Sequence, residues 1–263
     1  MEADDIPMAS TPDSSSASTF TADQLDDGLN QLLPPGHLQV LGLLMRDTGQ
    51  SLPKLVDWYE NIHAPNARFS WPHMRRYARN YITDVEEGPT PPYRVLTEFD
   101  WKSEADKVKA REAFKSPAAL QAMASEFEGT PPAWLADIYS ILVPITPLQA
   151  SGTPLPDDGT EPVQRRALLL RRRDTASQQP FEQSLRRLAD EIAALAPDAG
   201  VTIGICHGPR AAREEPDAVL FVHDAAGIAL PRPDPAVSEV INIFAVEMRK
   251  SPIPPPGGPI QHR

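Results

Sequence analysis

The chain has 263 residues, of which 41% are hydrophobic and 23% charged, as in an ordinary globular protein. Its net charge of −11 comes mostly from residues 1–36, which hold seven acidic residues and no Lys or Arg. The rest carries 29 acidic against 25 basic residues, without the basic excess that neutralises phosphates, so we expect no nucleic-acid partner. The single cysteine, Cys206, excludes an internal disulfide and a multi-cysteine metal site.

The composition also varies along the chain and delimits two units. Residues 1–36 and the tail 251–263 are rich in Ser, Thr, Asp or Pro, and we expect both to be disordered. The prolines and glycines of residues 149–164 predict a linker. The acidic start lacks the apolar core of a secretory signal, and no apolar run approaches the roughly 20 residues that span a bilayer. We therefore expect a cytoplasmic protein without a membrane partner.

Residues 37–148 form the first predicted unit. Ser51 is suited to cap its first helix, and Pro53 fits the first turn of that helix. Its second helix is expected to break at Ser116-Pro117. The expected elements are a strand over 38–46, a helix over 52–62, strands over 74–83 and 93–101, a helix over 104–127 and a strand over 138–145. This β-α-β-β-α-β order is the ferredoxin-like pattern.

Residues 165–250 repeat the scheme in a shorter form. Strands are expected over 167–171, 201–206, 218–223 and 240–248, and one helix begins at Pro180, with a stripe of Phe181, Leu185, Leu188, Ile192 and Leu195. The segment 224–237 holds Gly227 and three prolines, which leave no room for a second helix of ordinary length. The fold class is thus α+β, with two antiparallel sheets packed into an intrachain pseudo-dimeric α/β barrel. We expect its pockets between each sheet and its own helices.

Four motifs carry a resemblance to a known family. They are Leu-Val-Asp-Trp-Tyr-Glu-Asn-Ile-His-Ala-Pro-Asn-Ala at 55–67, Met-Arg-Arg-Tyr-Ala-Arg-Asn at 74–80, Val-Leu-Thr-Glu-Phe-Asp-Trp at 95–101 and Phe-Lys-Ser-Pro-Ala-Ala-Leu at 114–120. With them, residues 38–147 resemble the EthD family of the dimeric α/β-barrel superfamily. The resemblance implies a protein of ether degradation or aromatic polyketide tailoring, in some members a decarboxylase or lyase that needs no metal or organic cofactor. The superfamily also includes monooxygenases, isomerases and haem-degrading enzymes.

His63 is the first candidate for chemistry. Steps of three and four residues along the helix place it on the stripe that faces the expected pocket. An imidazole with a pKa near its usual value of about 6.5 exchanges protons at neutral pH, although a histidine at a helix end also stabilises that end. Tyr77 and Tyr81 share one strand face and Tyr59 lies on the helix stripe, so they would supply phenol donors and aromatic walls, or serve as ordinary packing residues.

Three further residues complete the expected site. Glu98 lies in an apolar strand, where an inward orientation would raise its pKa by desolvation and an outward one would leave it solvated. In the site it would hold the charge state of the His63 imidazole. Asn80 would orient the substrate, but it has the opposite strand parity from Tyr77, so both face one pocket only if a bulge intervenes. Trp101 would stack on a ligand or pack in the core.

The remaining signals are assigned to structure. Cys206 lies in an apolar run and is expected to pack as a small hydrophobe. His207 and His223 lack a third ligand, and the sequence holds no Gly-rich phosphate loop or zinc motif, so we expect no metal and no cofactor. The basic cluster Arg165, Arg166 and 171–173 is expected to be a solvated strand end.

Three functions follow as hypotheses. The first is a cofactor-independent decarboxylase, lyase or cyclase for an aromatic or polyketide-like substrate, with His63 exchanging the proton and Tyr77 and Asn80 orienting the substrate. The second is a non-catalytic ligand-binding or accessory protein, and the third is a monooxygenase of the same superfamily. A tandem chain of this kind would be a monomer with a pseudo-dimer core or a homodimer.

Overall fold

The computed structural model describes residues 30, 34–45, 51–126, 140–152, 163–207, 215–223, 229–233 and 235–248. Its first half consists of β1 (Gln39–Met45), α2 (Leu52–Trp58), the π-helix η1 (Tyr59–His63), α3 (Ala64–Asn66), the short turns η2 (Ala67–Phe69) and η3 (Trp71–His73), β2 (Met74–Glu87), β3 (Tyr93–Trp101), α4 (Glu104–Phe114), α5 (Pro117–Glu126) and β4 (Ser140–Ser151). Its second half consists of β5 (Val163–Arg172), α6 (Gln178–Leu195), β6 (Val201–Cys206), β7 (Ala218–His223) and β8 (Val237–Met248).

The strands form a closed antiparallel barrel of two related sheets. The first sheet has the order β4-β1-β3-β2, and the second has the corresponding order β8-β5-β7-β6. The second strand of each half pairs with the fourth strand of the other, because β2 pairs with β8 and β6 with β4. Each half therefore has ferredoxin-like strand order, and the prediction of a tandem α+β chain that closes into an intrachain α/β barrel is confirmed.

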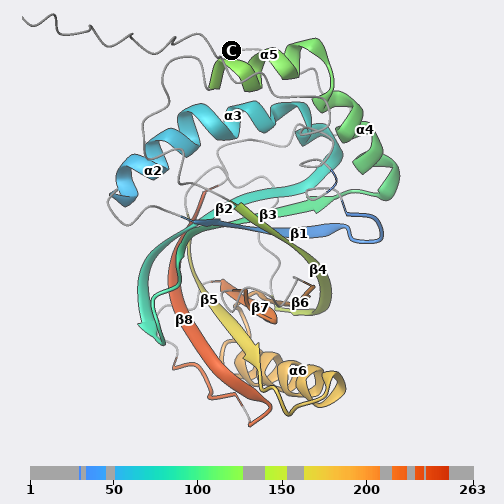
Figure 1. The fold of residues 1–263 in the computed structure, drawn as a ribbon. Helices are drawn as coiled ribbons and strands as arrows, with labels where there is room; N and C mark the ends of the chain where they lie inside the picture. Colours follow the sequence, from blue (N-terminus) through green and yellow to red (C-terminus); the bar gives the residue numbers. More distant parts are fainter. Residues whose placement is uncertain are drawn as a thin grey trace, which may run out of the picture.

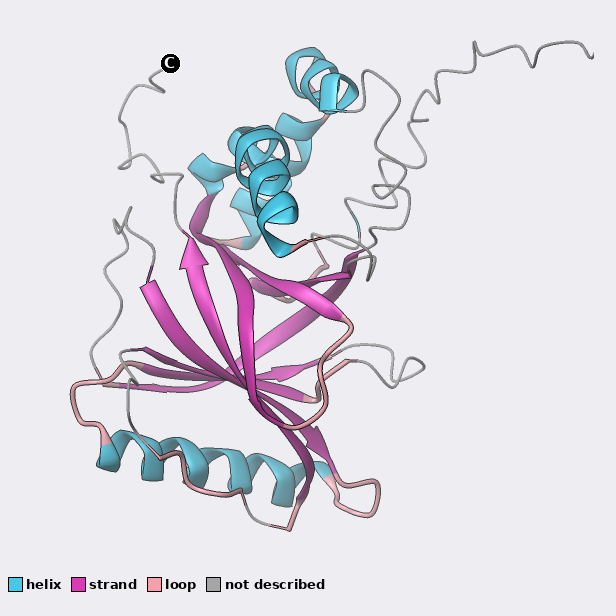
Figure 2. Cartoon of the chain, turned by 90° about the vertical axis from the view of Figure 1, so that its left-hand side faces the viewer, coloured by secondary structure: helices cyan, strands magenta, loops and turns pink. Residues whose placement is uncertain are grey.

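Helices cover the barrel from two opposite sides (Figure 1, Figure 2). Helices α2 to α5 lie over the outer face of the first sheet, and α6 lies over the second. Three buried clusters result: one between the first sheet and its helices, one inside the barrel and one between the second sheet and α6. Alternate residues of each strand thus face the barrel interior or the helices.

The first predicted helix is interrupted by a π turn, which changes the residues that it buries. Within η1 the hydrogen bonds span an extra residue, so the 3.6-residue stripe does not continue past Trp58. Glu60 is turned inward and buried, while Ile62 is turned outward and is 46% exposed. The 3.6-residue period predicts a buried stripe of Leu52, Leu55, Val56, Tyr59, Ile62 and His63, and this prediction is wrong for Ile62. The predicted break in the second helix is confirmed, since α4 ends at Phe114 and α5 begins at Pro117.

Strand β4 continues beyond the expected end of the first unit. Two of its residues are prolines, and Pro147 lies where the register against β6 shifts, a position that tolerates the missing N–H. Gln149 to Ser151 thus belong to β4, and β5 already begins at Val163, so both ends of the expected linker are strand. Gly152, just past β4, has a φ of +77°, and a Cβ there would lie 1.8 Å from the Ala199 carbonyl oxygen.

Several sequence-based predictions fall outside the described residues. These are most of the N-terminal segment 1–36, the middle of the linker, the tail 251–263 and residues 224–228 and 234 of the segment 224–237. In the part of the chain that the structure does describe, no helix has the length and apolarity needed to cross a membrane.

Candidate functional site

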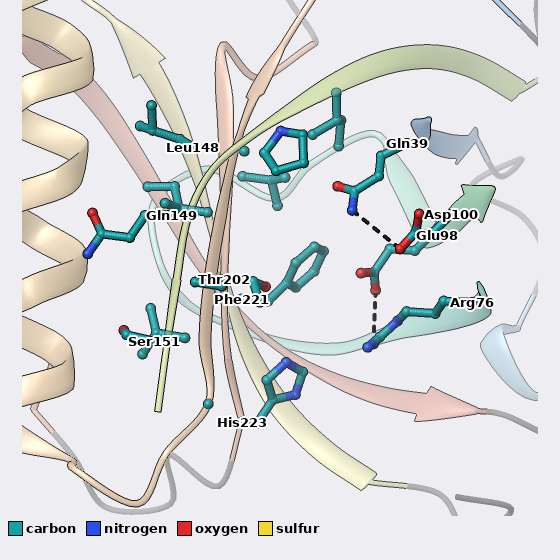
Figure 3. A pocket seen from close by; sticks show the side chains of 18 of the residues that line it. Gln39, Arg76, Glu98, Asp100, Leu148, Gln149, Ser151, Thr202, Phe221 and His223 are labelled. Atoms are coloured by element: carbon teal, nitrogen blue, oxygen red, sulfur yellow. Dashed lines mark hydrogen bonds and ion pairs between the residues drawn. The ribbon is translucent and has the colours of Figure 1, made fainter. Parts of the chain in front are cut away.

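A pocket of about 570 Å³ lies in the barrel interior, lined by β1, β2 and β3 on one side and by β4, β6 and β7 on the other. Figure 3 shows Gln39, Arg76, Glu98 and Asp100 together on one side, with Phe221 between them and the opposite wall. That opposite wall is mostly apolar or small, with Ile145, Leu148, Thr202, Gly204 and Val219 among its residues. The pocket is thus polar on the side of β1, β2 and β3, and on the side of β4, β6 and β7 it is largely apolar, with Gln149, Ser151 and His223 as polar exceptions.

Strand alternation explains why charged residues gather there. On β3, Leu96 packs in the barrel core, and residues two and four positions later, Glu98 and Asp100, face the same interior. Across the ladder, Arg76 of β2 pairs with Asp100, and Gln39 of β1 also pairs with it. Four polar side chains from three strands therefore meet at one place.

Glu98 is the centre of an ion-pair network. It accepts hydrogen bonds from Arg165 of β5 and from Asn80 Nδ2 at 2.9 Å, and its Oε1 lies 3.5 Å from Arg76 Nη2. Burial alone would raise the pKa of Glu98, but Arg165, Arg76 and the Asn80 hydrogen bond outweigh it and lower the pKa to about 2. Glu98 is therefore an ionised anchor at neutral pH. The expectation that an inward Glu98 would have a raised pKa is wrong, because the arginines were not foreseen.

Asp100 is the other pocket carboxyl, and its electrostatics are opposite. Its Oδ2 accepts a hydrogen bond from Gln39 Nε2 at 3.4 Å, and its Oδ1 lies 3.5 Å from Arg75 Nε. Burial raises the pKa of Asp100, and the opposing effects of Arg75, Gln39 and Arg76 do not cancel it. A carboxyl with a raised pKa in a pocket is a candidate proton donor or acceptor. Sequence reasoning missed Asp100, although its shared parity with Glu98 was a usable signal.

Two arginines of the basic cluster, Arg165 and Arg166, are buried in β5, contrary to the expectation of a solvated strand end. Arg165 is 1% exposed and Arg166 is 5% exposed. Arg165 contacts Glu98 inside the barrel and stacks 3.8 Å from the Phe221 ring, while Arg166 donates to Glu86 Oε1 at 2.8 Å on the other face of the sheet. Arg165 pairs with Glu98 of β3 and Arg166 with Glu86 of β2, so these two arginines form ion pairs between the two halves of the chain. Only the residues from Arg171 onward lie at the exposed strand end.

His63 lies on the other side of the first sheet from this pocket. Its ring stacks on Trp58, with centroids 5.1 Å apart, and contacts Tyr59 edge-on at 4.7 Å. The first sheet lies between His63 and Glu98, since β3 turns Glu98 toward the barrel interior and His63 belongs to the helix layer. The expected pairing of His63 with Glu98 is therefore wrong. Opposite parity also separates Asn80, which faces the interior, from Tyr77, and their strand has no bulge between them.

Side chains fill the space expected to be a pocket between the first sheet and its helices. Arg79 forms a bidentate pair with Glu60, at 2.7 Å and 3.0 Å, and Tyr81 donates to the same carboxylate at 2.5 Å. Burial would lower the pKa of Arg79, but the Glu60 contacts outweigh it and raise the pKa, so the guanidinium stays charged. Tyr59 shares a 3.0 Å hydrogen bond with Thr97.

The predicted aromatic residues all belong to this filled layer. Tyr59, Tyr77, Tyr81 and Trp101 are each at most 4% exposed and lie in one cluster with Leu55 and Met74. Burial raises the pKa of each of the three phenols, so they remain protonated donors. The structure thus brings the three tyrosines together around Glu60 and Arg79, which the sequence reasoning did not identify as a buried pair, and places Trp101 in the same cluster. It separates them from Asn80 and Glu98.

Metal ligands do not gather in the part of the chain described by the structure, where no group of three or more His, Cys, Asp or Glu is placed to hold an ion. His223 lines the pocket and is 3% exposed, while His207 contacts Thr146 Oγ1 at 2.8 Å and the His37 ring at 5.1 Å. The two histidines singled out in the sequence therefore have different surroundings.

Comparison with models of known protein families finds no match, and comparison with curated protein sequences finds none either. Among solved structures, a candidate monooxygenase from Lactobacillus acidophilus NCFM matches 82% of this chain and 98% of its own, at 10% identity and a TM-score of 0.42. Another candidate monooxygenase, from Fusobacterium nucleatum subsp. nucleatum, covers 81% and 94%, at 8% identity and a TM-score of 0.43. A chlorite dismutase variant from Candidatus Nitrospira defluvii, in complex with cyanide, matches 86% of this chain and 95% of its own, at 9% identity and a TM-score of 0.36. Similarities at this level say nothing about the activity or ligand of this chain.

Proposed function

We propose that the chain binds a small organic molecule in the pocket between its two sheets and catalyses proton transfer on it. The observation that carries the proposal is the pocket itself, whose volume of about 570 Å³ is in the range of small-molecule sites and whose polar groups converge on one wall. The site is thus on the inner face of the first sheet, away from His63.

Asp100 is the residue to which we assign the proton transfer. It lines the pocket, its side chain is 19% exposed, and burial raises the pKa of its carboxyl toward the range of an acid that gives and takes protons. Glu98 has the complementary role, because as a permanently ionised carboxylate it holds Arg76 and Asn80 in place. In many active sites with two carboxyl groups, one has a raised pKa and exchanges protons, while the other stays ionised.

The reaction class that we propose is a decarboxylation or a related elimination or cyclisation of an aromatic or polyketide-like substrate. Asp100 would deliver the proton to the carbon that loses the carboxylate, while the arginine side chains of the same wall would bind oxygen substituents. The resemblance of residues 38–147 to the EthD family favours this class. Proton transfer by these side chains requires no metal or organic cofactor.

The test uses phenolic acids that lose carbon dioxide on protonation of the ring, namely β-resorcylic acid, orsellinic acid and a hydroxynaphthoic acid. Carbon dioxide release and deuterium uptake from D₂O are measured for the full chain. We expect Asp100→Asn to reduce turnover by at least about 100-fold, since a general acid contributes about 10²- to 10⁴-fold. His63→Ala is expected to stay within about threefold of the unmodified chain because its side chain does not reach the pocket.

A blocking variant tests the location independently. Thr202→Phe places a ring in the pocket from the second-half wall and should abolish substrate binding, whereas Thr83→Phe, on an exposed strand position outside the pocket, should not. If His63→Ala lost turnover while Asp100→Asn kept it, the reaction would take place on the helix side of the first sheet and the proposed role of Asp100 would be wrong. Tight binding without carbon dioxide release or deuterium uptake would contradict catalysis and leave a ligand-binding protein.

A further inference from the structure

The charges of the polar pocket wall do not cancel. Three guanidinium groups, those of Arg75, Arg76 and Arg165, surround two carboxylates, Glu98 and Asp100, which lie on neighbouring interior positions of β3. Even with both carboxylates ionised, this group of five has a net charge of about +1, and protonation of Asp100 makes it more positive. In a partly buried pocket, such an excess is screened less than on the open surface.

The three arginines differ in their access to a ligand. Arg165 has a fully buried side chain that is enclosed by Glu98 and the Phe221 ring. Arg75 is at the rim, with a 54% exposed side chain, and its Nε and Nη2 donate to the Trp101 carbonyl oxygen at 3.3 and 3.1 Å.

Arg76 combines access with enclosure. Its side chain is 20% exposed, lines the pocket and extends beside Glu98 from the polar wall (Figure 3). Its distance of 3.5 Å from Glu98 Oε1 is longer than an ideal charged hydrogen bond, whereas Arg165 is in direct contact with the same oxygen. Glu98 therefore positions the Arg76 guanidinium while Arg165 provides most of the neutralisation.

The rest of the pocket favours an apolar body for the ligand. Beyond the polar wall, Ile145, Leu148, Val219 and the Phe221 ring line the pocket, with the polar Gln149, Ser151, Thr202 and His223 among them. Gly204 adds no side chain to this wall, and a Cβ at this position would lie 2.4 Å from Ile145 Cγ2. A largely apolar wall opposite a positively charged wall suits a small ligand with an apolar body and an anionic head.

We propose that the pocket selects a compact apolar molecule with an anionic carboxylate head, and that Arg76 is the residue that binds the head and determines this specificity. A charged guanidinium donor binds a carboxylate more strongly than it binds a neutral amide, and it repels an ammonium group. The inference rests on the proposed function only in using the same pocket, and it holds for a binding protein as well as for an enzyme.

Three probes of one shape separate the charge of the head from the fit of the body. They are naphthoate, naphthamide and naphthylmethylamine, and their dissociation constants are measured calorimetrically at neutral pH and low salt. We expect naphthoate to bind at least about tenfold more tightly than naphthamide, since hydrogen bonds to charged groups are stronger than neutral ones, and the cationic amine to bind most weakly. Raising the salt concentration should weaken only naphthoate binding.

Arg76→Gln is expected to weaken naphthoate binding by about tenfold or more and to change naphthamide binding by less than about twofold. Arg76→Lys should keep the preference for the anion but bind it less tightly, because a point charge replaces the planar fork. Arg232→Gln, at an exposed position outside the pocket, is the matched control and should change none of the three constants. Thermal unfolding of each variant checks that the fold is intact.

The outcomes distinguish the two proposals. If naphthoate and naphthamide bind equally, or if Arg76→Gln weakens all three probes alike, the charge inference is overturned while the pocket remains a site. If none of the probes binds, both proposals fail. If the anion preference depends on Arg76 but no phenolic acid is turned over, the inference is supported and the catalytic proposal fails.

Discussion

The two halves bury their helices against their sheets by different chemistry. In the second half, α6 presents apolar residues to the sheet, among them Phe181, Leu185 and Leu188, and it also buries Ser184. In the first half, the π turn places the Glu60 carboxylate against Arg79 and Tyr81 in the middle of an aromatic cluster. The same layer arrangement is thus stabilised mainly by the burial of apolar side chains in the second half. In the first half, a hydrogen-bonded buried ion pair contributes as well.

This difference also explains where the cavity lies. Both helix layers are closely filled, the first by large aromatic and paired charged side chains and the second by aliphatic ones. The inner sheet faces pack well where they are apolar, as at Leu41, Leu43 and Ile243. Where β1, β2 and β3 instead carry Gln39, Arg76, Glu98 and Asp100, the facing sheet does not fill the space, and a pocket remains.

The largest expected effect tests the ion pair of the first half. Glu60→Ala leaves Arg79 buried without its carboxylate and should lower the free energy of unfolding by about 3–5 kcal/mol, measured by urea denaturation. The double variant Glu60→Leu/Arg79→Met should recover much of this loss, because removing both charges removes the unpaired one.

Leu185→Ala in α6 provides the matched control from the second half. It should cost about 2–5 kcal/mol through lost burial and a cavity, and since a leucine forms no ion pair, no second substitution of a charged partner can restore the loss. If Glu60→Ala were nearly neutral, or the double variant were no more stable than the single one, the contrast between the halves would be wrong.

A smaller effect is expected at the junction of the halves and depends on pH. Arg165 and Arg76 outweigh the effect of burial and lower the pKa of Glu98 from 4.5 to about 2. A carboxyl with a lowered folded-state pKa stabilises the fold above its unfolded pKa, and this contribution is lost as pH falls from 4.5 through about 2. The unmodified chain should lose on the order of 2 kcal/mol of its free energy of unfolding over that range, and Glu98→Gln should not show this loss. Urea unfolding at each pH measures it.

The exposed Glu191→Gln on α6 is the control for this slope and should retain the pH dependence of the unmodified chain. An unchanged slope in Glu98→Gln would mean that the contact between β3 and β5 does not join the halves electrostatically.

The smallest effect has the opposite sign and concerns Asp100. Burial raises its pKa above 3.8, so ionising it in the fold costs stability as pH rises through the folded-state value. Asp100→Asn should therefore be more stable than the unmodified chain at pH 7, by less than about 1 kcal/mol, and equally stable below pH 3.8, where the carboxyl is neutral in both states. Thermal unfolding at the two pH values measures this, and a variant that is less stable at pH 7 would show that Asp100 has a structural role.

Local patterns were enough to predict the order of the elements. Apolar runs located β6 and β7 to the residue, the apolar stripe from Phe181 located α6, and Ser116-Pro117 located the break between α4 and α5. Predicted boundaries failed where the chain departs from ideal periods, as at the π turn η1 and at the strand prolines of β4. In both cases a tertiary contact stabilises a geometry that local propensity disfavours.

The candidate site divides in the same way. The sequence by itself determined that Glu98 and Asp100 share one face of β3 and that Tyr77 and Tyr81 share one face of β2, because strand alternation is a local property. Only the tertiary structure decided which face meets the other half, and therefore that Glu98 contacts Arg165, 67 residues away, and not His63. The charge and pKa of a buried carboxyl depend on such distant partners, so the chemistry of the pocket follows from the closure of the barrel.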